Sequence, residues 1–218
     1  MNRDLARLAG MAVLLLLGLA VAVGLYQRSE ERQQAERLER AKTDDSIFIR
    51  PHSRSLGPAD AKVTLVEFLD PECESCRAVH PMVKELLERY RGRLRLVVRY
   101  MPLHPNSVFA VGALEAAGAQ GRYWEMLETL FEHQPIWGSH HAPRPDLIPG
   151  YARQIGLDME AFQAYLDSGA HRGITERDEA DGRALGVRGT PTFFVNEQPV
   201  QPLGYGPLKA MIEEELAR

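Results

Sequence analysis

A pair of cysteines between an apolar run and a helical pattern constrains the fold more than any other feature of this chain. The run Val63–Leu69 is apolar or β-branched at nearly every position and contains neither Gly nor Pro, so it predicts a buried strand. Cys73 and Cys76, the only cysteines of the chain, follow it, and apolar residues then recur at helical spacing over residues 79–90. The cysteines therefore lie where a strand gives way to a helix.

Two cysteines in this position indicate reactive thiols. The amide N–H groups and the dipole at a helix N-terminus stabilise an anion, which lowers the pKa of a thiol such as Cys73. Cysteines three residues apart can close a disulfide, and Cys76 can resolve a mixed disulfide formed at Cys73. The predicted chemistry is thiol–disulfide exchange, in which the dithiol carries two electrons and no small-molecule cofactor is needed.

Two other uses of the pair are less consistent with the sequence. A structural zinc site usually has four ligands, and the chain has no second cysteine pair and only His80 nearby in sequence. A structural disulfide over so short a loop removes little entropy from the unfolded chain. We expect no metal site, and we keep a redox-inert copper or zinc carrier as the alternative from a different class.

Composition and charge exclude other classes of protein. The chain has 218 residues, of which 44% are hydrophobic and 26% charged, and its formal net charge is −4. These values suit one globular domain, placed at residues 46–218, after an N-terminal extension. No basic stripe is interleaved with aromatic residues, so nucleic acid is not an expected partner.

Residues 1–26 are predicted to form a single transmembrane anchor. The run Leu8–Tyr26 contains no charged residue, and as a helix its length is close to the roughly 30 Å hydrocarbon core of a bilayer. A cleaved signal peptide is the alternative, because Ala20-Val21-Ala22 matches a small-x-small cleavage pattern. The apolar run continues beyond that pattern, which favours a retained anchor.

The location of the domain follows from two signals that disagree. Lys and Arg are more frequent after the apolar run than before it, which by loop charge places the domain in the cytoplasm. A lone cysteine pair behind such a leader suits an oxidising compartment, and we give this signal more weight. Residues 27–45, rich in Glu and Arg, are predicted to be a polar helical spacer. We therefore expect a single-pass membrane protein whose folded domain is exported.

The remaining pattern predicts a β-α-β half and a β-β-α half separated by a largely helical insertion at about residues 106–185. A parallel pair of strands is expected on either side of the cysteine helix. The further strands are predicted at Ile47–Ile49, Leu94–Met101, Thr192–Asn196 and Pro199-Val200, with a final helix at about Pro207–Ala217.

Three segments carry a resemblance to a known family. GPADAKVTLVEFLDPECESCRAVHP, RYMPLHPNS and GVRGTPTFFVN resemble the DsbA-like thiol–disulfide oxidoreductases of the thioredoxin superfamily, over the chain from about Leu56 to the C-terminus. The resemblance implies an α/β thioredoxin fold with a helical insertion, here preceded by a transmembrane helix. It also implies exported protein substrates with cysteines and a membrane redox partner, DsbB-like or DsbD-like. The alternative within this class is an isomerase or reductase that serves haem or copper maturation.

The resemblance assigns roles to individual residues. Cys73 is the expected nucleophile and Cys76 the resolving thiol. Glu67 is the only ionisable residue of the central strand, and burying an acid is costly, so we expect it to be the family's proton relay for Cys76. The alternative is a Glu that points out from a partly exposed strand. Thr190-Pro191 is expected to form a cis peptide beside the cysteines, which leaves backbone groups free to bind an extended substrate.

The dipeptide Glu74-Ser75 between the cysteines departs from the Pro-His of strongly oxidising members. A carboxylate near Cys73 disfavours the thiolate, so we predict a milder oxidant, unless Glu74 is solvated and its charge screened. The histidines receive no catalytic role: His80 is predicted to pack, His104 to be structural, and His140-His141 to lie on a surface loop.

Overall fold

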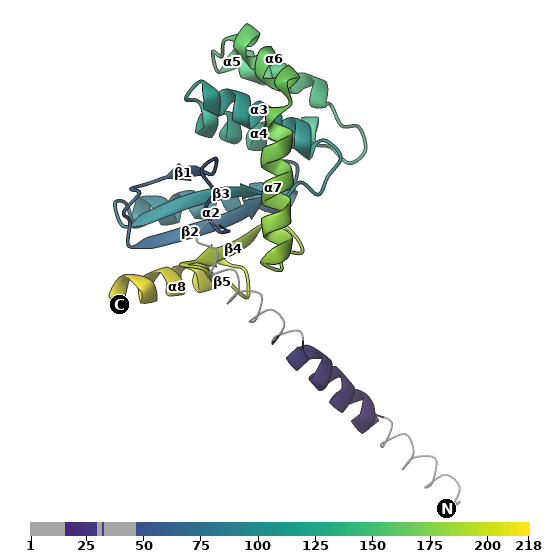
Figure 1. Cartoon of the computed structure of the whole chain (residues 1–218), viewed down its shortest axis with the longest axis vertical. Coiled ribbons are helices and arrows are strands. Elements are labelled where there is room, and N and C mark those ends of the chain that lie inside the picture. Colours follow the sequence, from purple (N-terminus) through teal and green to yellow (C-terminus); the bar gives the residue numbers. More distant parts are fainter. Residues whose placement is uncertain (1–15, 30–31, 33–46) are drawn as a thin grey trace, which may run out of the picture.

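A five-stranded mixed sheet with the strand order β1-β3-β2-β4-β5 lies at the centre of the folded part (Figure 1). The computed structural model describes residues 16–29, 32 and 47–218. The central strands β2 and β3 are parallel, and every other neighbouring pair is antiparallel. The strands are β1 (Arg54–Leu56), β2 (Val63–Leu69), β3 (Leu94–Tyr100), β4 (Thr192–Val195) and β5 (Gln198–Pro199).

Both faces of the central strands are covered, which explains why the sequence of β2 is apolar almost throughout. Side chains alternate between the faces of a strand. Val63 and Leu65 belong to the apolar cluster that contains residues of α2 (Glu74–Arg89) and α8 (Tyr205–Ala217). Val66 and Phe68 belong to a second cluster, with Leu185 and Val187 from the chain after α7. The connection from β2 to β3 through α2 is the expected β-α-β unit.

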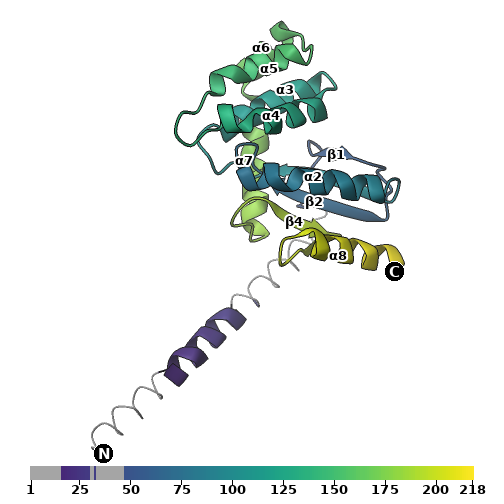
Figure 2. The same cartoon turned by 180° about the vertical axis from the view of Figure 1, so that it is seen from behind.

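Five α-helices lie between β3 and β4 in the sequence, and most of them form a layer beyond one end of the sheet (Figure 2). α3 packs against α4, α5, α6 and α7, so it is the centre of this layer. Nine of its thirteen residues are buried, in agreement with its apolar sequence. The helices are α3 (Ser107–Ala119), α4 (Tyr123–Trp137), α5 (Ile148–Gln154), α6 (Met159–Ser168) and α7 (Ala170–Ala184), with a 3-10 turn η1 (Pro145–Leu147) before α5.

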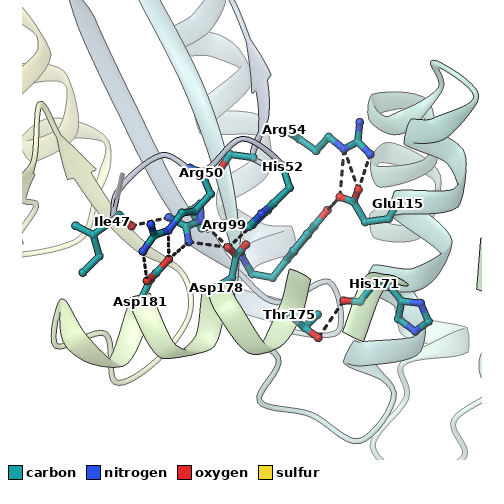
Figure 3. Close-up of polar contacts among 12 residues, drawn as sticks. Ile47, Arg50, His52, Arg54, Arg99, Glu115, His171, Thr175, Asp178 and Asp181 are labelled. Atoms are coloured by element: carbon teal, nitrogen blue, oxygen red, sulfur yellow. Dashed lines mark hydrogen bonds and ion pairs between the residues drawn. The ribbon is translucent and has the colours of Figure 1, made fainter. Parts of the chain in front are cut away.

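A buried ion network fastens α7 to the sheet (Figure 3). Arg99 of β3 is fully buried, and its guanidinium donates to Asp178 at 2.8 Å and to Asp181 at 2.5 Å. The segment before β1 also belongs to the network, because Arg50 donates to Asp181 at 2.7 Å and His52 Nε2 lies 2.7 Å from Asp178 Oδ1. Three segments that are distant in sequence are therefore joined through two aspartates.

The predicted edge strand at Ile47–Ile49 is wrong. Residues 47 and 48 form a bend, and the Ile47 carbonyl accepts a hydrogen bond from Arg99 Nη1 at 2.6 Å instead of a strand partner. The edge of the sheet is instead formed by Arg54–Leu56. This strand lies in a stretch rich in turn residues, so the sequence pattern did not predict it. Within the insertion, α4 continues through Pro135 to Trp137, and α7 begins at Ala170.

The N-terminal predictions fall largely outside the described residues. Residues 16–29 are helical and mostly exposed. None of the helices within the described ranges is both long and apolar enough to span a bilayer. The predicted anchor begins at Leu8, and most of the predicted spacer at 27–45 is not described.

Candidate active site

The two thiols occupy successive turns at the start of α2. Cys73 is the N-cap residue and is 8% exposed, whereas Cys76 is fully buried. The chain enters the helix through a turn in which the Cys73 amide donates to the Asp70 carbonyl at 3.1 Å. Both cysteines are free, so the site is in its dithiol form. The N-terminal thiol is therefore nearly buried as well, and the second thiol lies one turn further along the helix, without any exposed surface.

Their surroundings give the two thiols opposite acidities. The hydrogen bond with Cys76 lowers the pKa of Cys73 to about 5 against the effect of burial, and Thr190 and the amides of Ser75 and Cys76 act in the same direction. Burial raises the pKa of Cys76 far above its ordinary value, with further contributions from Cys73 and from the charge of Glu67. At neutral pH the outer sulfur is therefore a thiolate and the inner one a thiol.

Glu67 lies in the interior, with only 3% of its surface exposed. Glu67 is two residues from both Leu65 and Leu69 on β2, so the three side chains share one face of the strand. This is the face of the sheet that α2 covers. Burial raises the pKa of its carboxyl to about 8, so the group holds a proton at pH 7. The alternative of an outward-pointing glutamate is wrong for this strand.

Thr190 and Pro191 lie against the outer thiol. The peptide bond between them is cis, as expected, and Cys73 Sγ lies 3.3 Å from the Thr190 carbonyl oxygen. A cavity of about 410 Å³ is lined by both residues together with Gly189, Phe193 and other residues of the β4–β5 region. The structure therefore brings together residues from the two ends of the fold that the sequence separates by 117 positions.

Glu74 and Ser75 are exposed at the helix start. Glu74 Oε1 lies 2.6 Å from His140 Nε2, in the loop that follows α4. Its own backbone amide lowers the pKa of the Glu74 carboxyl, and the charge of His140 contributes in the same direction. His140 is on a surface loop, as predicted, and this loop approaches the start of α2 at Glu74.

Sequence reasoning missed the residues that hold the cysteine loop, residues 70–73 before α2, in place. The buried carboxylate of Asp70 accepts from the Leu103 amide at 2.7 Å and from the Ser107 hydroxyl at 2.5 Å. Glu72 accepts from the amide and the side-chain nitrogen of Asn106, both at 2.7 Å. The only sequence signal for this contact is the position of both acids on either side of Pro71, directly after a buried strand.

The helical layer also binds the cysteine loop, through hydrogen bonds from Gln134 of α4. This buried amide donates to the carbonyls of Pro71, at 2.8 Å, and Cys73, at 3.0 Å, and it accepts from Arg77 Nε at 3.0 Å. A polar residue on a mostly apolar helix face is the one signal that could have indicated it. Within the ranges that the structure describes, no three His, Cys, Asp or Glu side chains are grouped so that they could hold a metal ion.

Known proteins resemble this chain in sequence and in fold. The sequence model of the family described as Thioredoxin (Thioredoxin_4) matches residues 50–214. The Na(+)/H(+) antiporter NhaA of Herminiimonas arsenicoxydans is 42% identical over 139 residues, which are 64% of this chain and 21% of the antiporter. The chain thus spans about a fifth of the length of the curated relatives that it matches.

Two solved structures share the fold. A thioredoxin-like oxidoreductase from Silicibacter pomeroyi DSS-3 is 28% identical, with a TM-score of 0.68 over 80% of this chain and 98% of that one. Oxidised BdbD from Bacillus subtilis is 26% identical, with a TM-score of 0.69 over 77% of this chain and 94% of that one. The family match and the shared fold agree: the chain belongs to the thioredoxin family, and it is similar in fold to a thioredoxin-like oxidoreductase and to BdbD.

Proposed function

We propose that Cys73 and Cys76 form the couple with which this protein exchanges disulfides with exported proteins. The observation that carries the proposal is the opposite acidity of the two sulfurs. A thiolate with a pKa of about 5 is a good leaving group in exchange, and a buried thiol one turn away is placed to resolve a mixed disulfide.

In the oxidising direction the reaction has two steps. A substrate thiolate attacks Cys73 Sγ of the disulfide, the Cys73–Cys76 bond breaks, and Cys76 leaves with the electron pair of that bond. The neutral Glu67 carboxyl then supplies a proton to Cys76. The raised pKa of Glu67 supports this predicted relay. A second substrate thiolate then attacks the substrate sulfur of the mixed disulfide and expels the Cys73 thiolate. Two electrons pass from the substrate dithiol to the protein, and the substrate gains one disulfide.

The Thr190-Pro191 segment is the proposed binding site for an extended stretch of substrate. It contacts Cys73 directly, and it borders a cavity of about 410 Å³. The substrates proposed are exported proteins with cysteines. A membrane redox partner, DsbB-like if the couple is reoxidised or DsbD-like if it is reduced, would complete the cycle. The predicted anchor at residues 1–26 would hold the domain at the inner membrane, facing the periplasm.

Trapping of the mixed disulfide tests the proposal. The Cys76→Ser variant of the full chain, incubated with a scrambled or oxidised cysteine protein, should accumulate a mixed disulfide through Cys73, whereas Cys73→Ser should form none. The wild-type protein should reduce insulin in the presence of dithiothreitol. Copper or zinc retained through purification, together with absent exchange, would instead identify a metal carrier.

A further inference from the structure

The side-chain amide of Gln134 is bound to the backbone of Cys73 itself. Its nitrogen donates to the Cys73 carbonyl at 3.0 Å and to the Pro71 carbonyl at 2.8 Å, and its oxygen accepts from Arg77 Nε at 3.0 Å. Gln134 is only 1% exposed, so water does not compete for these contacts. One side chain of the helical layer therefore fixes the chain before Cys73, at Cys73 and in the first turn of α2.

Close packing of α4 against the cysteine loop keeps this amide within reach. α4 ends at Trp137, and Gly138 follows it as the C-cap residue. A Cβ at Gly138 would lie 3.2 Å from Glu72 Cγ, which is tighter than an ordinary van der Waals contact. The backbone of Gly138, with φ −103°, is in a conformation that other residues also adopt. The absence of a side chain there thus serves the close approach of α4 to the loop.

The acidity of Cys73 depends on the backbone that Gln134 holds. The hydrogen bond with Cys76 lowers the pKa of Cys73 most, and the amides of Ser75 and Cys76 add to that effect. All of these groups lie in the first turn of α2. The Cys73 carbonyl also accepts from the Arg77 amide at 3.2 Å, which is the first hydrogen bond of the helix. A cysteine directs its sulfur through a single torsion angle, so a displaced backbone carries the sulfur away from the first turn.

We propose that Gln134 is a positioning residue for Cys73: by binding the Pro71 and Cys73 carbonyls, it keeps the nucleophilic sulfur aligned with the first turn of α2. The inference deepens the function proposed for the Cys73–Cys76 couple and rests on it. Gln134 acts through the backbone of Cys73 and takes no part in bond making or breaking. Without its donors, two carbonyl oxygens of the cysteine loop lose a buried partner, and the loop relaxes towards other donors.

A Gln134→Met variant of the full chain tests the proposal. Met keeps the length of the side chain and its lack of charge, but it neither donates to the carbonyls nor binds Arg77. In the dithiol protein, the thiolate absorbance at 240 nm should appear at a pH higher by about half a unit or more than in the wild type. Alkylation of Cys73 by iodoacetamide at pH 5 should slow by about twofold or more, because fewer molecules carry the thiolate. Gln163→Met is the matched control, since Gln163 is exposed on α6.

Urea unfolding separates this role from a purely structural one. Gln134→Met should also lower the stability of the fold, because it leaves buried carbonyls without a donor. A folded Gln134→Met protein that is less stable but has the wild-type absorbance curve and alkylation rate would overturn the proposal. An equal shift in Gln163→Met would overturn it as well.

Gly138→Ala is the milder variant, for use if Gln134→Met does not fold. The added Cβ presses on Glu72 and moves the end of α4 away from the cysteine loop, so the absorbance curve should shift in the same direction by a smaller amount. Gly173→Ala is its control, because a Cβ there meets nothing within 4 Å. Equal curves for Gly138→Ala and Gly173→Ala would then refute the inference. None of these measurements needs a substrate, so a shifted curve in a protein without exchange activity would contradict the proposed function alone.

Discussion

Three titrating residues in different surroundings are proposed to carry the chemistry of the site. Hydrogen bonds hold the pKa of Cys73 near 5, whereas burial raises the pKa values of Cys76 and Glu67. The negative charge of the dithiol form is thereby kept at the outer sulfur, and a proton is kept in the interior. A Cys76 thiolate expelled into the interior needs that proton, because an unpaired buried anion is costly.

Replacing Glu67 with Gln should slow the exchange steps that pass through Cys76. Gln keeps the size of the side chain but holds no transferable proton, and loss of a general acid commonly costs a factor of about 10² or more. Single-turnover oxidation of a model dithiol peptide, followed from pH 5 to 9, measures the effect. The wild-type rate should fall as Glu67 loses its proton near pH 8, and the variant should lack this inflection. A variant with the wild-type profile would remove Glu67 from the mechanism.

The same substitution should change how stability depends on pH. The folded-state pKa of Glu67 is about 8, above the ordinary value of 4.5, so the folded chain binds the proton more tightly than the unfolded chain. The resulting stability is fully present below about pH 4.5 and is lost as the pH rises towards 8. Urea unfolding at pH 5 and pH 8 should therefore show a loss of stability in the wild type that Glu67→Gln reduces. An equal loss in both proteins would show that Glu67 is not held protonated.

Glu74 and His140 should set the reduction potential in opposite directions. The carboxylate opposes the Cys73 thiolate, and the imidazole 2.6 Å away compensates part of its charge. Glu74→His should make the couple more oxidising, by about 30 mV for a tenfold change in the equilibrium constant, and His140→Ala should make it more reducing. Equilibration with glutathione measures both values. A Glu74→His protein with an unchanged or more negative potential would contradict this role.

Among the elements, local patterns determined what could be predicted. β2, β3 and α2 follow directly from apolar periodicity, and Cys73 follows from its place between them. The strand at Arg54–Leu56 could not be found in this way, because it has only three residues and an edge strand does not need an apolar pattern. Asp70 and Gln134 could not be paired with their partners either, since those contacts span from 33 to 63 positions and leave no periodic signal.

The ion network that joins α7 to β3 should be the most sensitive polar feature of the fold. Arg99→Met would leave Asp178 and Asp181 without their fully buried partner, and breaking a buried pair from one side typically costs about 3–5 kcal/mol. Urea unfolding should show this loss. Arg91→Met is the matched control, because that side chain is 78% exposed, and its effect should stay within about 0.5 kcal/mol. Equal effects of the two substitutions would mean that the network does not hold α7 in place.

For the whole molecule, the location of the domain and the direction of electron flow are linked. A stabilised Cys73 thiolate favours the dithiol form over the disulfide, so under the proposed function the couple would accept electrons from substrates and would need to be reoxidised. Reoxidation depends on an oxidising compartment, and reaching that compartment depends on the predicted anchor at residues 1–26.

Acid quenching and alkylation of thiols in cells tests both points together. The full chain should be recovered in the membrane fraction with Cys73 and Cys76 mainly as a disulfide. A version that lacks residues 1–26 should stay in the cytoplasm and be mainly a dithiol, because thiols are kept reduced there. A full chain that is exported but mainly reduced would identify an isomerase or reductase served by a DsbD-like partner. The proposed anchor would instead be contradicted if the full and the shortened chain had the same redox state and were recovered in the same cell fraction.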